Sequence, residues 1–164
     1  MPELHFTEAS PDQAALVARM VRRAFGPQAA ILGVNKVDHP YYAAFQTAAR
    51  VRQRMAEGGQ VVIAWLGEVP VGTLTYSRGR QHSDDGWIER VAVLPEFQGR
   101  YYGEALMAYA EKRLRKRGAK TLRLAIVKPF DHLRRFYEKL GYHATETKQY
   151  PGVPFEVEYM EKEA

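Results

Sequence analysis

The stretch spanning residues 87–106 holds residues whose types and order suit the binding of a phosphate group. Val91–Val93 is a short apolar run of β type, and the following Pro95 cannot donate to a sheet ladder, so a strand is predicted to end there. Gln98–Arg100 then leads into Gly103, where a helical pattern begins. A helix N-terminus carries unpaired backbone N–H groups and partial positive charge. We therefore predict an anion-binding turn for a phosphorylated cofactor.

Other motifs for nucleotides, metals and nucleophiles do not fit the chain. No G-x-x-x-x-G-K-[ST] run exists, which excludes a P-loop, and Gly99 and Gly103 do not form the dinucleotide fingerprint G-x-G-x-x-G. The chain has no HExxH motif, no EF-hand loop and no G-x-S-x-G elbow, and its five histidines show no paired spacing for a metal. We therefore expect neither a metal site nor a serine nucleophile.

The composition is that of a globular protein. With 164 residues, of which 46% are hydrophobic and 26% charged, the chain is predicted to form one domain over residues 1–164. The absence of cysteine excludes disulfides, thiolate metal sites and a cysteine nucleophile. The first ten residues lack the basic and apolar regions of a signal peptide, and no apolar run reaches membrane-spanning length. We expect a cytoplasmic protein with no membrane partner.

The net charge of +5 fits a polyanionic cofactor as well as a nucleic acid. The densest basic cluster lies at the end of the helix predicted over 102–117, where the helix dipole favours cations and a solvated face is the simplest interpretation. No basic stripe with exposed aromatic residues accompanies the cluster, so we expect no nucleic-acid partner.

Hydrophobic periodicity and turn residues predict the order of the elements. Strands are expected at Leu4–Thr7, Gln60–Trp65, Val71–Tyr76, Trp87–Leu94, Thr121–Val127, Tyr142–Gln149 and Phe155–Glu161. Helices are expected from Ser10 to a stop at Gly26-Pro27, and over Tyr41–Glu57, Tyr102–Arg117 and Pro129–Gly141. Alternating strands and helices in the second half, with hairpins elsewhere, predict an α/β fold with a mixed sheet.

Two segments resemble motifs of one protein family. The run Val91-Ala92-Val93-Leu94-Pro95-Glu96-Phe97-Gln98-Gly99-Arg100-Tyr101-Tyr102-Gly103-Glu104-Ala105-Leu106 resembles the acetyl-CoA-binding motif of the GNAT family of N-acetyltransferases. The run Phe136-Tyr137-Glu138-Lys139-Leu140-Gly141-Tyr142 resembles the family's second motif. The spacing of the two motifs and the order of the predicted elements are also similar to the family's over essentially the whole chain.

The resemblance implies a GNAT-like fold, with a mixed, mostly antiparallel sheet of about seven strands and about four helices. It implies that strands Trp87–Leu94 and Thr121–Val127 splay apart and that acetyl-CoA, the co-substrate, lies in the gap without a metal. Backbone groups of Val91 and Val93 would pair with the pantetheine arm, and later N–H groups would hold the pyrophosphate, where glycine permits close approach. The implied cofactor-binding residues are Val91, Ala92, Val93, Gln98, Gly99, Arg100, Tyr101, Tyr102, Gly103 and Glu104.

The implied reaction is direct transfer of the acetyl group to a primary amine of a small molecule or peptide. Tyr137 would lie near the sulfur, where a protonated phenol can donate to the departing thiolate. Its helical spacing alone favours a core aromatic instead, and the resemblance shifts the interpretation to the catalytic role. Glu89 is the first candidate for the general base, because strand alternation predicts it on the same face as Val91 and Val93. The Val93 N–H would stabilise the oxyanion.

Several assignments stay open at this point. Other candidates for the general base are His82, Asp84, Asp85, His132 and a chain of waters. The acceptor pocket is expected between the first two helices and the loop 150–155, and the aromatic residues Tyr41, Tyr42 and Phe45 either line it or pack ordinarily. Dimers are common in the family, so a homodimer also stays open.

Two residues depart from the family pattern. Tyr101 stands where the family usually has glycine, and its side chain either crowds the pyrophosphate loop or points outward and leaves the amide usable. Phe130 stands seven residues before Tyr137, where many members carry asparagine, so we carry no cofactor contact over to it. These departures motivate the alternative of a non-catalytic or degenerate acyl-CoA-binding module with the same fold.

Overall fold

A computed structural model describes residues 3–79 and 83–164 of the chain. Its centre is a seven-stranded sheet of order β1-β2-β3-β4-β5-β7-β6, in which β4 and β5 are the one parallel pair of neighbours among the described strands. The strands are β1 (Leu4–Glu8), β2 (Gln60–Leu66), β3 (Val69–Arg78), β4 (Asp85–Val93), β5 (Thr121–Val127), β6 (His143–Gln149) and β7 (Glu156–Glu163). The predicted mixed, mostly antiparallel sheet is confirmed.

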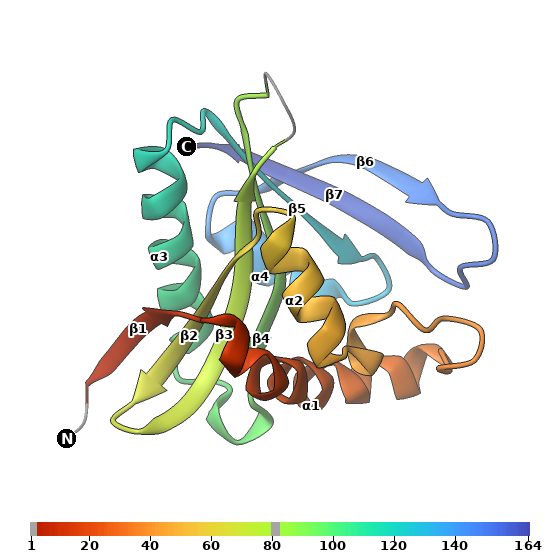
Figure 1. Cartoon of the computed structure of the whole chain (residues 1–164). Coiled ribbons are helices and arrows are strands. Elements are labelled where there is room, and N and C mark those ends of the chain that lie inside the picture. The colour runs from red at the N-terminus through yellow and green to blue at the C-terminus, as the bar shows by residue number, and fades with distance from the viewer. Residues whose placement is uncertain (1–2, 80–82) are drawn as a thin grey trace.

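Helices cover both faces of the sheet (Figure 1). They are α1 (Ala14–Leu32), α2 (Ala48–Ala56), α3 (Tyr102–Lys116) and α4 (Asp131–Lys139), with 3₁₀ turns η1 (Pro11–Gln13), η2 (Ala43–Phe45) and η3 (Pro95–Phe97). The α3 helix packs Leu106 and Leu114 into a core on one face. On the other face, α1 and α2 pack Val17, Val21 and Val51. In the part of the chain that the structure describes, no helix is long and apolar enough to cross a membrane.

The parallel strands β4 and β5 pair only at one end. Their register runs from Asp85 opposite Thr121 to Trp87 opposite Arg123. Beyond this point the two strands separate, while β4 continues its ladder with β3 and β5 continues with β7. The splay that the family resemblance implied is therefore present, and it leaves the middle of the sheet open.

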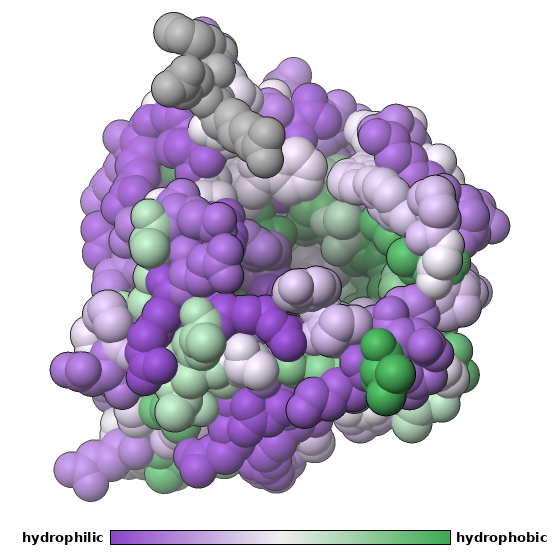
Figure 2. Space-filling model, turned by 45° about the vertical axis from the view of Figure 1, so that its right-hand side comes forward, coloured by the Kyte–Doolittle hydropathy of each residue, from purple (hydrophilic) through white to green (hydrophobic). Residues whose placement is uncertain are grey.

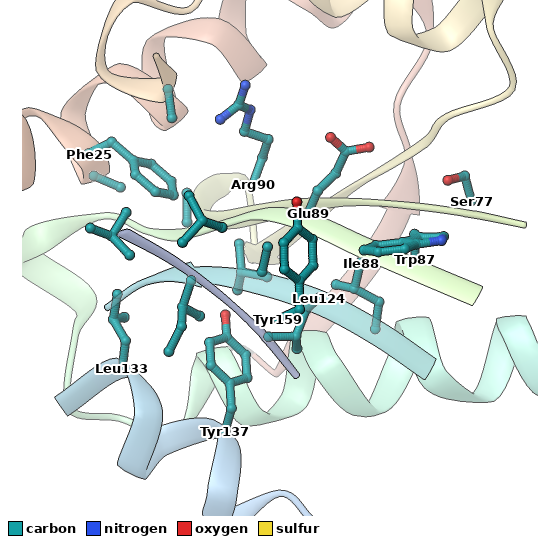
Figure 3. A pocket seen from close by; sticks show the side chains of 18 of the residues that line it. Phe25, Ser77, Trp87, Ile88, Glu89, Arg90, Leu124, Leu133, Tyr137 and Tyr159 are labelled. Carbon is teal, nitrogen blue, oxygen red and sulfur yellow. The ribbon is translucent and has the colours of Figure 1, made fainter. Parts of the chain in front are cut away.

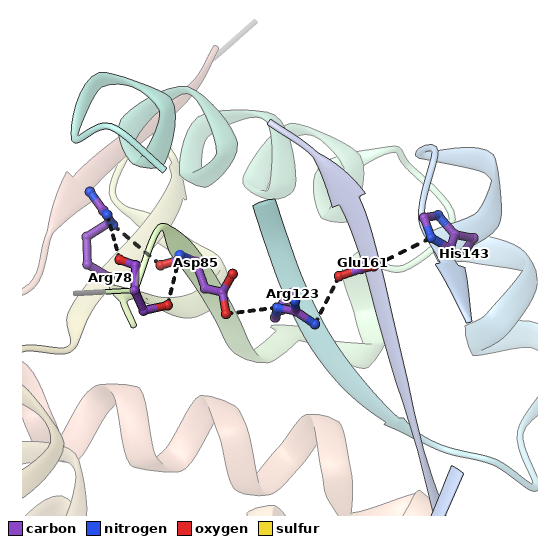
Figure 4. Close-up of polar contacts among 6 residues, drawn as sticks. Arg78, Asp85, Arg123, His143 and Glu161 are labelled. Atoms are coloured by element: carbon purple, nitrogen blue, oxygen red, sulfur yellow. Dashed lines mark hydrogen bonds and ion pairs between the residues drawn. The ribbon is translucent and has the colours of Figure 1, made fainter. Parts of the chain in front are cut away.

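Ion pairs across the strands close the paired end of β4 and β5 (Figure 4). The Arg123 guanidinium lies between Asp85 Oδ2 and Glu161 Oε2, at 2.9 Å from each. Arg78 of β3 donates to the backbone oxygen of Asp85 at 3.4 Å, and His143 Nε2 of β6 lies 3.8 Å from Glu161. These contacts join five strands at one end of the sheet and fix where the splay begins.

The prediction that Gly26-Pro27 stops the first helix is wrong. The α1 helix contains Pro27 and continues to Leu32. A proline inside a helix removes one backbone hydrogen bond, but burial of the following turn offsets this cost, since Ala29 packs in a small apolar cluster with Val34. The helix ends instead at Gly33, whose φ of 69° is the left-handed conformation that favours glycine.

The helix predicted over Tyr41–Glu57 is shorter in the structure. Its first part is the η2 turn, and α2 begins after Thr47. The Thr47 hydroxyl accepts a hydrogen bond from the Arg50 N–H at 3.2 Å and so caps the helix. Thr47 was the signal in the sequence that α2 starts later than predicted. Tyr41 and Tyr42 therefore lie in the segment that connects α1 to α2.

Candidate active site

A cavity of about 1300 Å³ opens where β4 and β5 separate. Residues 87–93 of β4 and 124–127 of β5 form its sides, and Phe25 of α1 and Tyr137 of α4 also line it, from opposite sides of the sheet. Figure 2 shows a hollow with apolar side chains in its depth and polar side chains around its rim. The lining is therefore able to hold an apolar chain while polar groups act at its borders.

The edge of β4 that faces the cavity carries an unpaired backbone donor. Leu94 donates its N–H to Val71 O of β3 at 2.9 Å. Because an antiparallel ladder alternates, the N–H of Val93 points to the other edge, where β5 no longer pairs. The Val93 carbonyl on that edge accepts a hydrogen bond from Gln98 Nε2 at 3.1 Å. The Val93 N–H is thus available to a ligand.

A row of backbone N–H groups follows directly after Gln98. In the described part of the chain, no amide from Gly99 to Glu104 finds a backbone acceptor, and the first helical bond is Ala105 N–H to Tyr101 O at 3.1 Å. Gly99 and Tyr101 both take the left-handed conformation, with φ of 80° and 66°, which turns the loop into the start of α3. Consecutive amides at a helix N-terminus form a site for an anion.

Gly103 brings the two predicted motifs together. A Cβ atom at this position would lie 3.2 Å from Cζ of Phe136 and 3.8 Å from Cγ2 of Val93. The glycine therefore permits close packing between the N-terminus of α3, helix α4 and strand β4. The loop that follows Gln98 and the Phe136–Tyr142 segment are therefore neighbours in space.

The departure at Tyr101 does not block the loop. The Tyr101 side chain is 78% exposed, and its backbone adopts the positive φ that glycine would take. The outward orientation, which was one of the two open alternatives, is the one in the structure. A tyrosine at position 101 therefore strains the backbone rather than crowding the loop, because the left-handed region disfavours a residue with a Cβ atom.

We expect Tyr101→Gly to raise the free energy of unfolding by up to about 1 kcal/mol, because relief of the strain outweighs the added freedom of the unfolded chain. The affinity for acetyl-CoA should change by less than about threefold, which corresponds to well under 1 kcal/mol. Urea unfolding and calorimetric titration measure the two quantities. Tyr41→Gly is the control, since Tyr41 is also exposed and has no positive φ. A large gain in affinity on Tyr101→Gly would show that the native loop is impaired.

Tyr137 projects from α4 into the cavity (Figure 3). Its ring is buried between Phe136 and Tyr142, with ring centroids 4.9 and 6.0 Å away. Burial raises the pKa of Tyr137 well above the usual value for a phenol, and among the described residues no hydrogen bond stabilises its ionised form. The hydroxyl is therefore a protonated donor that faces the cavity.

A buried polar cluster holds the end of α4 against α3. The Tyr142 hydroxyl donates to Glu111 Oε2 at 2.7 Å, and Lys162 Nζ of β7 lies 2.9 Å from the same oxygen. Lys162 also donates to the Leu140 carbonyl at 2.7 Å, just after the end of α4. Burial, followed by the bond to Glu111, raises the pKa of Tyr142. This cluster fixes the helix that carries Tyr137.

Replacing Glu111 with glutamine is expected to lower the free energy of unfolding by about 2 kcal/mol, because it leaves the Lys162 ammonium without its carboxylate. Urea denaturation measures the change. Tyr142→Phe removes only the neutral hydroxyl and keeps the Glu111–Lys162 pair, so its loss should be nearer to 1 kcal/mol. Equal losses for the two variants would contradict the importance of the ion pair.

The prediction that Glu89 shares a face with Val91 and Val93 is wrong. The ladder between β3 and β4 shifts by one residue near Arg90, whose φ is 55°, so β4 contains a β-bulge. Val91 and Val93 pack toward the α3 core, whereas Ala92 packs toward α1. Glu89 lies on the side of Ala92. The alternation rule failed because it assumed an unbroken strand.

Glu89 still lines the cavity, on the side opposite Tyr137 (Figure 3). Its carboxylate Oε1 accepts a hydrogen bond from Arg54 Nε of α2 at 2.7 Å. Arg54 in turn donates to the Ser77 hydroxyl at 2.8 Å. The arginine holds the carboxylate in place at the cavity wall, while the second carboxylate oxygen accepts no hydrogen bond from a described residue.

The structure places the other candidates for the general base in different surroundings. Asp84 is exposed and lies 3.8 Å from Lys120, and Asp85 borders the cavity but pairs with Arg123. His132 packs edge-on against Phe130 at a centroid distance of 5.7 Å and does not line the cavity. His82 lies outside the described residues. Among the predicted candidates, Glu89 is thus a carboxylate of the cavity wall whose second oxygen accepts no hydrogen bond from a described residue, and Glu57, which sequence reasoning did not consider, lines the same cavity.

Sequence reasoning missed several residues of the cavity wall. Among them are Gln28, Arg54, Glu57, Trp87, Arg90 and Tyr159. Of the predicted aromatic cluster only Tyr42 lines the cavity, where it packs against Phe155 at 5.8 Å between ring centroids. The Tyr159 hydroxyl bonds to that of Tyr150, and this bond, together with burial, raises the pKa of Tyr159 to about 12. The one signal in the sequence for Arg90 was the presence of a charged arginine inside a predicted strand.

Comparisons with known proteins agree with this architecture. The model of a family described as "Acetyltransferase (GNAT) family" matches residues 16–142, more than half of the chain. The chain therefore belongs to the GNAT acetyltransferase family, as the two motifs indicated. No curated protein sequence matches the chain significantly.

Solved structures with low sequence identity share the fold. A protein described as a GNAT-family acetyltransferase from Desulfovibrio desulfuricans has a TM-score of 0.77 and 22% identity, covering 98% of this chain and 99% of its own. The PaiA N-acetyltransferase from Thermoplasma acidophilum, solved with coenzyme A, has a TM-score of 0.73 and 16% identity, covering 99% of each chain. YncA from Salmonella typhimurium, solved with acetyl-CoA, has a TM-score of 0.72 and 18% identity, covering 98% and 94%.

Proposed function

We propose that the protein is an acetyl-CoA-dependent N-acetyltransferase that transfers the acetyl group directly to a primary amine of a small molecule or peptide. The observation that carries this proposal is the open gap between β4 and β5. A free N–H at Val93, a protonated Tyr137 and a carboxylate at Glu89 border the same cavity. Membership of the GNAT family supports the acetyl group as the group transferred.

The residues present fit acetyl-CoA on two independent observations. The unpaired edge of β4 at Val93 can pair with the extended pantetheine arm as a neighbouring strand would. The free amides from Gly99 to Glu104, at the positive end of the α3 dipole, suit the pyrophosphate. Arg100, which stacks over Phe97 at 5.9 Å from the ring centroid, adds positive charge to this loop.

Glu89, Val93 and Tyr137 have different roles in the proposed reaction. Acetyl-CoA supplies a thioester whose acyl carbon accepts the amine. Glu89 takes one proton from the ammonium form of the acceptor, and the neutral amine then forms the N–C bond while the Val93 N–H holds the negative charge that develops on the carbonyl oxygen. The second proton leaves the nitrogen to water as the amide forms. Tyr137 gives its phenolic proton to the sulfur as the C–S bond breaks, leaving an amide and a free thiol. Exchange with water returns both side chains to their starting states.

The β-bulge gives this division a geometric basis. It puts Glu89 on the α1 side of the sheet, while Tyr137 approaches from the α4 side. A proton acceptor and a proton donor on opposite sides of the gap suit an amine and a thiol that meet in the gap from opposite directions. The regular strand predicted from the sequence would instead have put Glu89 on the side of Val91 and Val93.

Calorimetric titration with acetyl-CoA, followed by mass spectrometry of the protein, tests the proposal. We expect saturable binding of one acetyl-CoA per chain. Without an amine, the mass of the protein should stay unchanged, because direct transfer forms no acetylated enzyme. No binding at millimolar acetyl-CoA would contradict the proposal, and an acetylated protein that passes its acetyl group to an amine would contradict direct transfer.

A further inference from the structure

Arg90 is a charged group of the cavity to which the proposed chemistry gives no role. Its guanidinium lines the cavity and points away from Tyr137, toward α1 and the segment that follows it (Figure 3). Successive side chains of a regular strand point to opposite faces. The bulge at Arg90 instead brings Glu89 and Arg90 to the same side of the sheet.

The backbone at this bulge is strained. A φ of 55° is uncommon for a residue with a Cβ atom, and such strain persists only where the surroundings impose it, often at a ligand site. Bulges beside active sites are known to redirect side chains. Here the result of the distortion is that a guanidinium reaches the cavity next to the proposed base.

The charge of Arg90 is not balanced by an ion pair. Its Nη2 donates to the backbone oxygen of Tyr41 at 3.3 Å, and no carboxylate of the described residues lies within ion-pair distance. The adjacent carboxylate of Glu89 is already held by Arg54 at 2.7 Å. Burial lowers the pKa of Arg90, and the opposite effects of Glu89 and Tyr42 do not cancel it.

The surroundings of Arg90 hold an excess of positive charge. A second cavity of about 230 Å³ lies between α2 and the sheet, and it shares Arg54, Glu57, Glu89 and Arg90 with the first. It adds Arg50, whose charge also acts to lower the pKa of Arg90. Three guanidinium groups thus face two carboxylates, so a bound anion would restore the balance.

Apolar side chains line the cavity next to Arg90. Phe25, Tyr42 and Phe155 line the cavity on the α1 side, and Tyr42 packs against Phe155. An acceptor that carries an anionic group and an apolar or aromatic body would therefore find partners for both. The flat fork of an arginine matches a carboxylate with two parallel hydrogen bonds.

We propose that Arg90 binds the carboxylate of the acceptor, so that the acceptor is an amino acid or a similar small molecule with an amine close to a carboxylate. This inference rests on the proposed N-acetyltransferase function and selects the small-molecule acceptor over the peptide. With the carboxylate on Arg90, the amine reaches the neighbouring Glu89. A peptide N-terminus presents a neutral amide at that point, which cannot balance the guanidinium charge.

The test compares amino acids with their carboxamides as acceptors. The twenty L-amino acids and the matching amides are incubated with acetyl-CoA, and kcat/KM is measured from the release of free thiol. We expect the best amino acid to exceed its amide at least about 30-fold, and Arg90→Gln to reduce that ratio to within about threefold. Arg90→Lys should retain part of the preference. Arg19→Gln, an exposed site remote from the cavity, is the charge-matched control.

The outcomes separate this inference from the proposed function. A preference for carboxylates that disappears in Arg90→Gln, with unchanged melting temperature and acetyl-CoA affinity, supports it. Preferred acetylation of amides or carboxylate-free amines, or a preference that survives Arg90→Gln, overturns it and leaves the N-acetyltransferase function standing. No acetyl transfer to any amine, although acetyl-CoA binds, overturns the proposed function and this inference with it.

Discussion

Replacing Tyr137 with phenylalanine is expected to lower kcat by about 10²- to 10⁴-fold, the usual contribution of a positioned general acid. The substitution keeps the ring that packs between Phe136 and Tyr142 and removes only the hydroxyl that faces the cavity. Without this donor the sulfur would leave as an unprotonated thiolate. Steady-state rates of thiol release, measured with the best amine, provide the comparison.

The control for this prediction is Tyr109→Phe. Tyr109 lies on α3 and bonds to Glu8 and Arg113, away from the cavity. It should keep kcat unchanged, and both variants should keep the acetyl-CoA affinity of the wild type. A Tyr137→Phe variant with wild-type kcat would show that Tyr137 is a core aromatic only, which was the interpretation that its helical spacing alone favoured.

The raised pKa of Tyr137 also predicts the shape of the pH profile. A general acid acts only below its own pKa, and burial moves the pKa of Tyr137 upward. The hydroxyl therefore stays protonated through neutral and alkaline pH, beyond the ordinary phenol value of about 10. The wild-type kcat should show no alkaline decline from this group up to about pH 10. A decline near pH 7 that disappears in Tyr137→Phe would contradict the assignment.

Replacing Glu89 with glutamine is expected to lower kcat/KM by about 10²- to 10³-fold at neutral pH. Glutamine has the same shape and can still accept the hydrogen bond from Arg54, so the cavity wall should keep its form. The variant loses only the negative oxygen that takes the proton from the amine. Thiol-release rates across a range of pH measure this loss.

The pH dependence distinguishes a lost base from a damaged site. In Glu89→Gln only amine molecules already deprotonated in solution can react, so kcat/KM should rise about tenfold for each pH unit until the pKa of the free amine is reached. At that pH the variant should approach the wild type. Glu68→Gln, in the turn between β2 and β3, is the control. A uniform loss at all pH values would show that Glu89 acts through structure rather than as a base.

The sequence was most informative where backbone requirements leave few alternatives. The helical pattern was predicted to begin at Gly103, where glycine would let the chain approach a phosphate. The structure adds a different reason for the small residue, which is its close packing against Phe136. The apolar runs of β4 and β5 were placed to within two residues of their observed bounds. Their separation followed from the family resemblance, because the strand patterns alone do not say where pairing stops.

The errors arose where tertiary packing overrode a local rule. Pro27 is a reliable local stop signal, yet contacts of the next helical turn carry α1 past it. The bulge at Arg90 has no marker such as glycine, so the alternation of β4 could not be corrected from the sequence. The partnership of Glu89 with Arg54 joins residues on two elements far apart in the chain, and only the fold reveals it.

The assignments of Tyr137, Glu89 and the cofactor-binding backbone stay predictions, as do the single domain, the cytoplasmic location and the absence of a nucleic-acid partner. Crowding by Tyr101, one of the two open alternatives, no longer supports a degenerate binding module, because the Tyr101 side chain points outward from the loop. Phe130 is buried directly before α4 and does not line the cavity.

Release of free thiol from acetyl-CoA in the presence and absence of an amine tests the central claim most directly. With a panel of amines and amino acids, we predict that thiol release depends on the amine and equals the amount of acetylated amine formed. Binding of acetyl-CoA without amine-dependent release from any member of the panel would contradict the account and show that the gap between β4 and β5 holds the cofactor without using it.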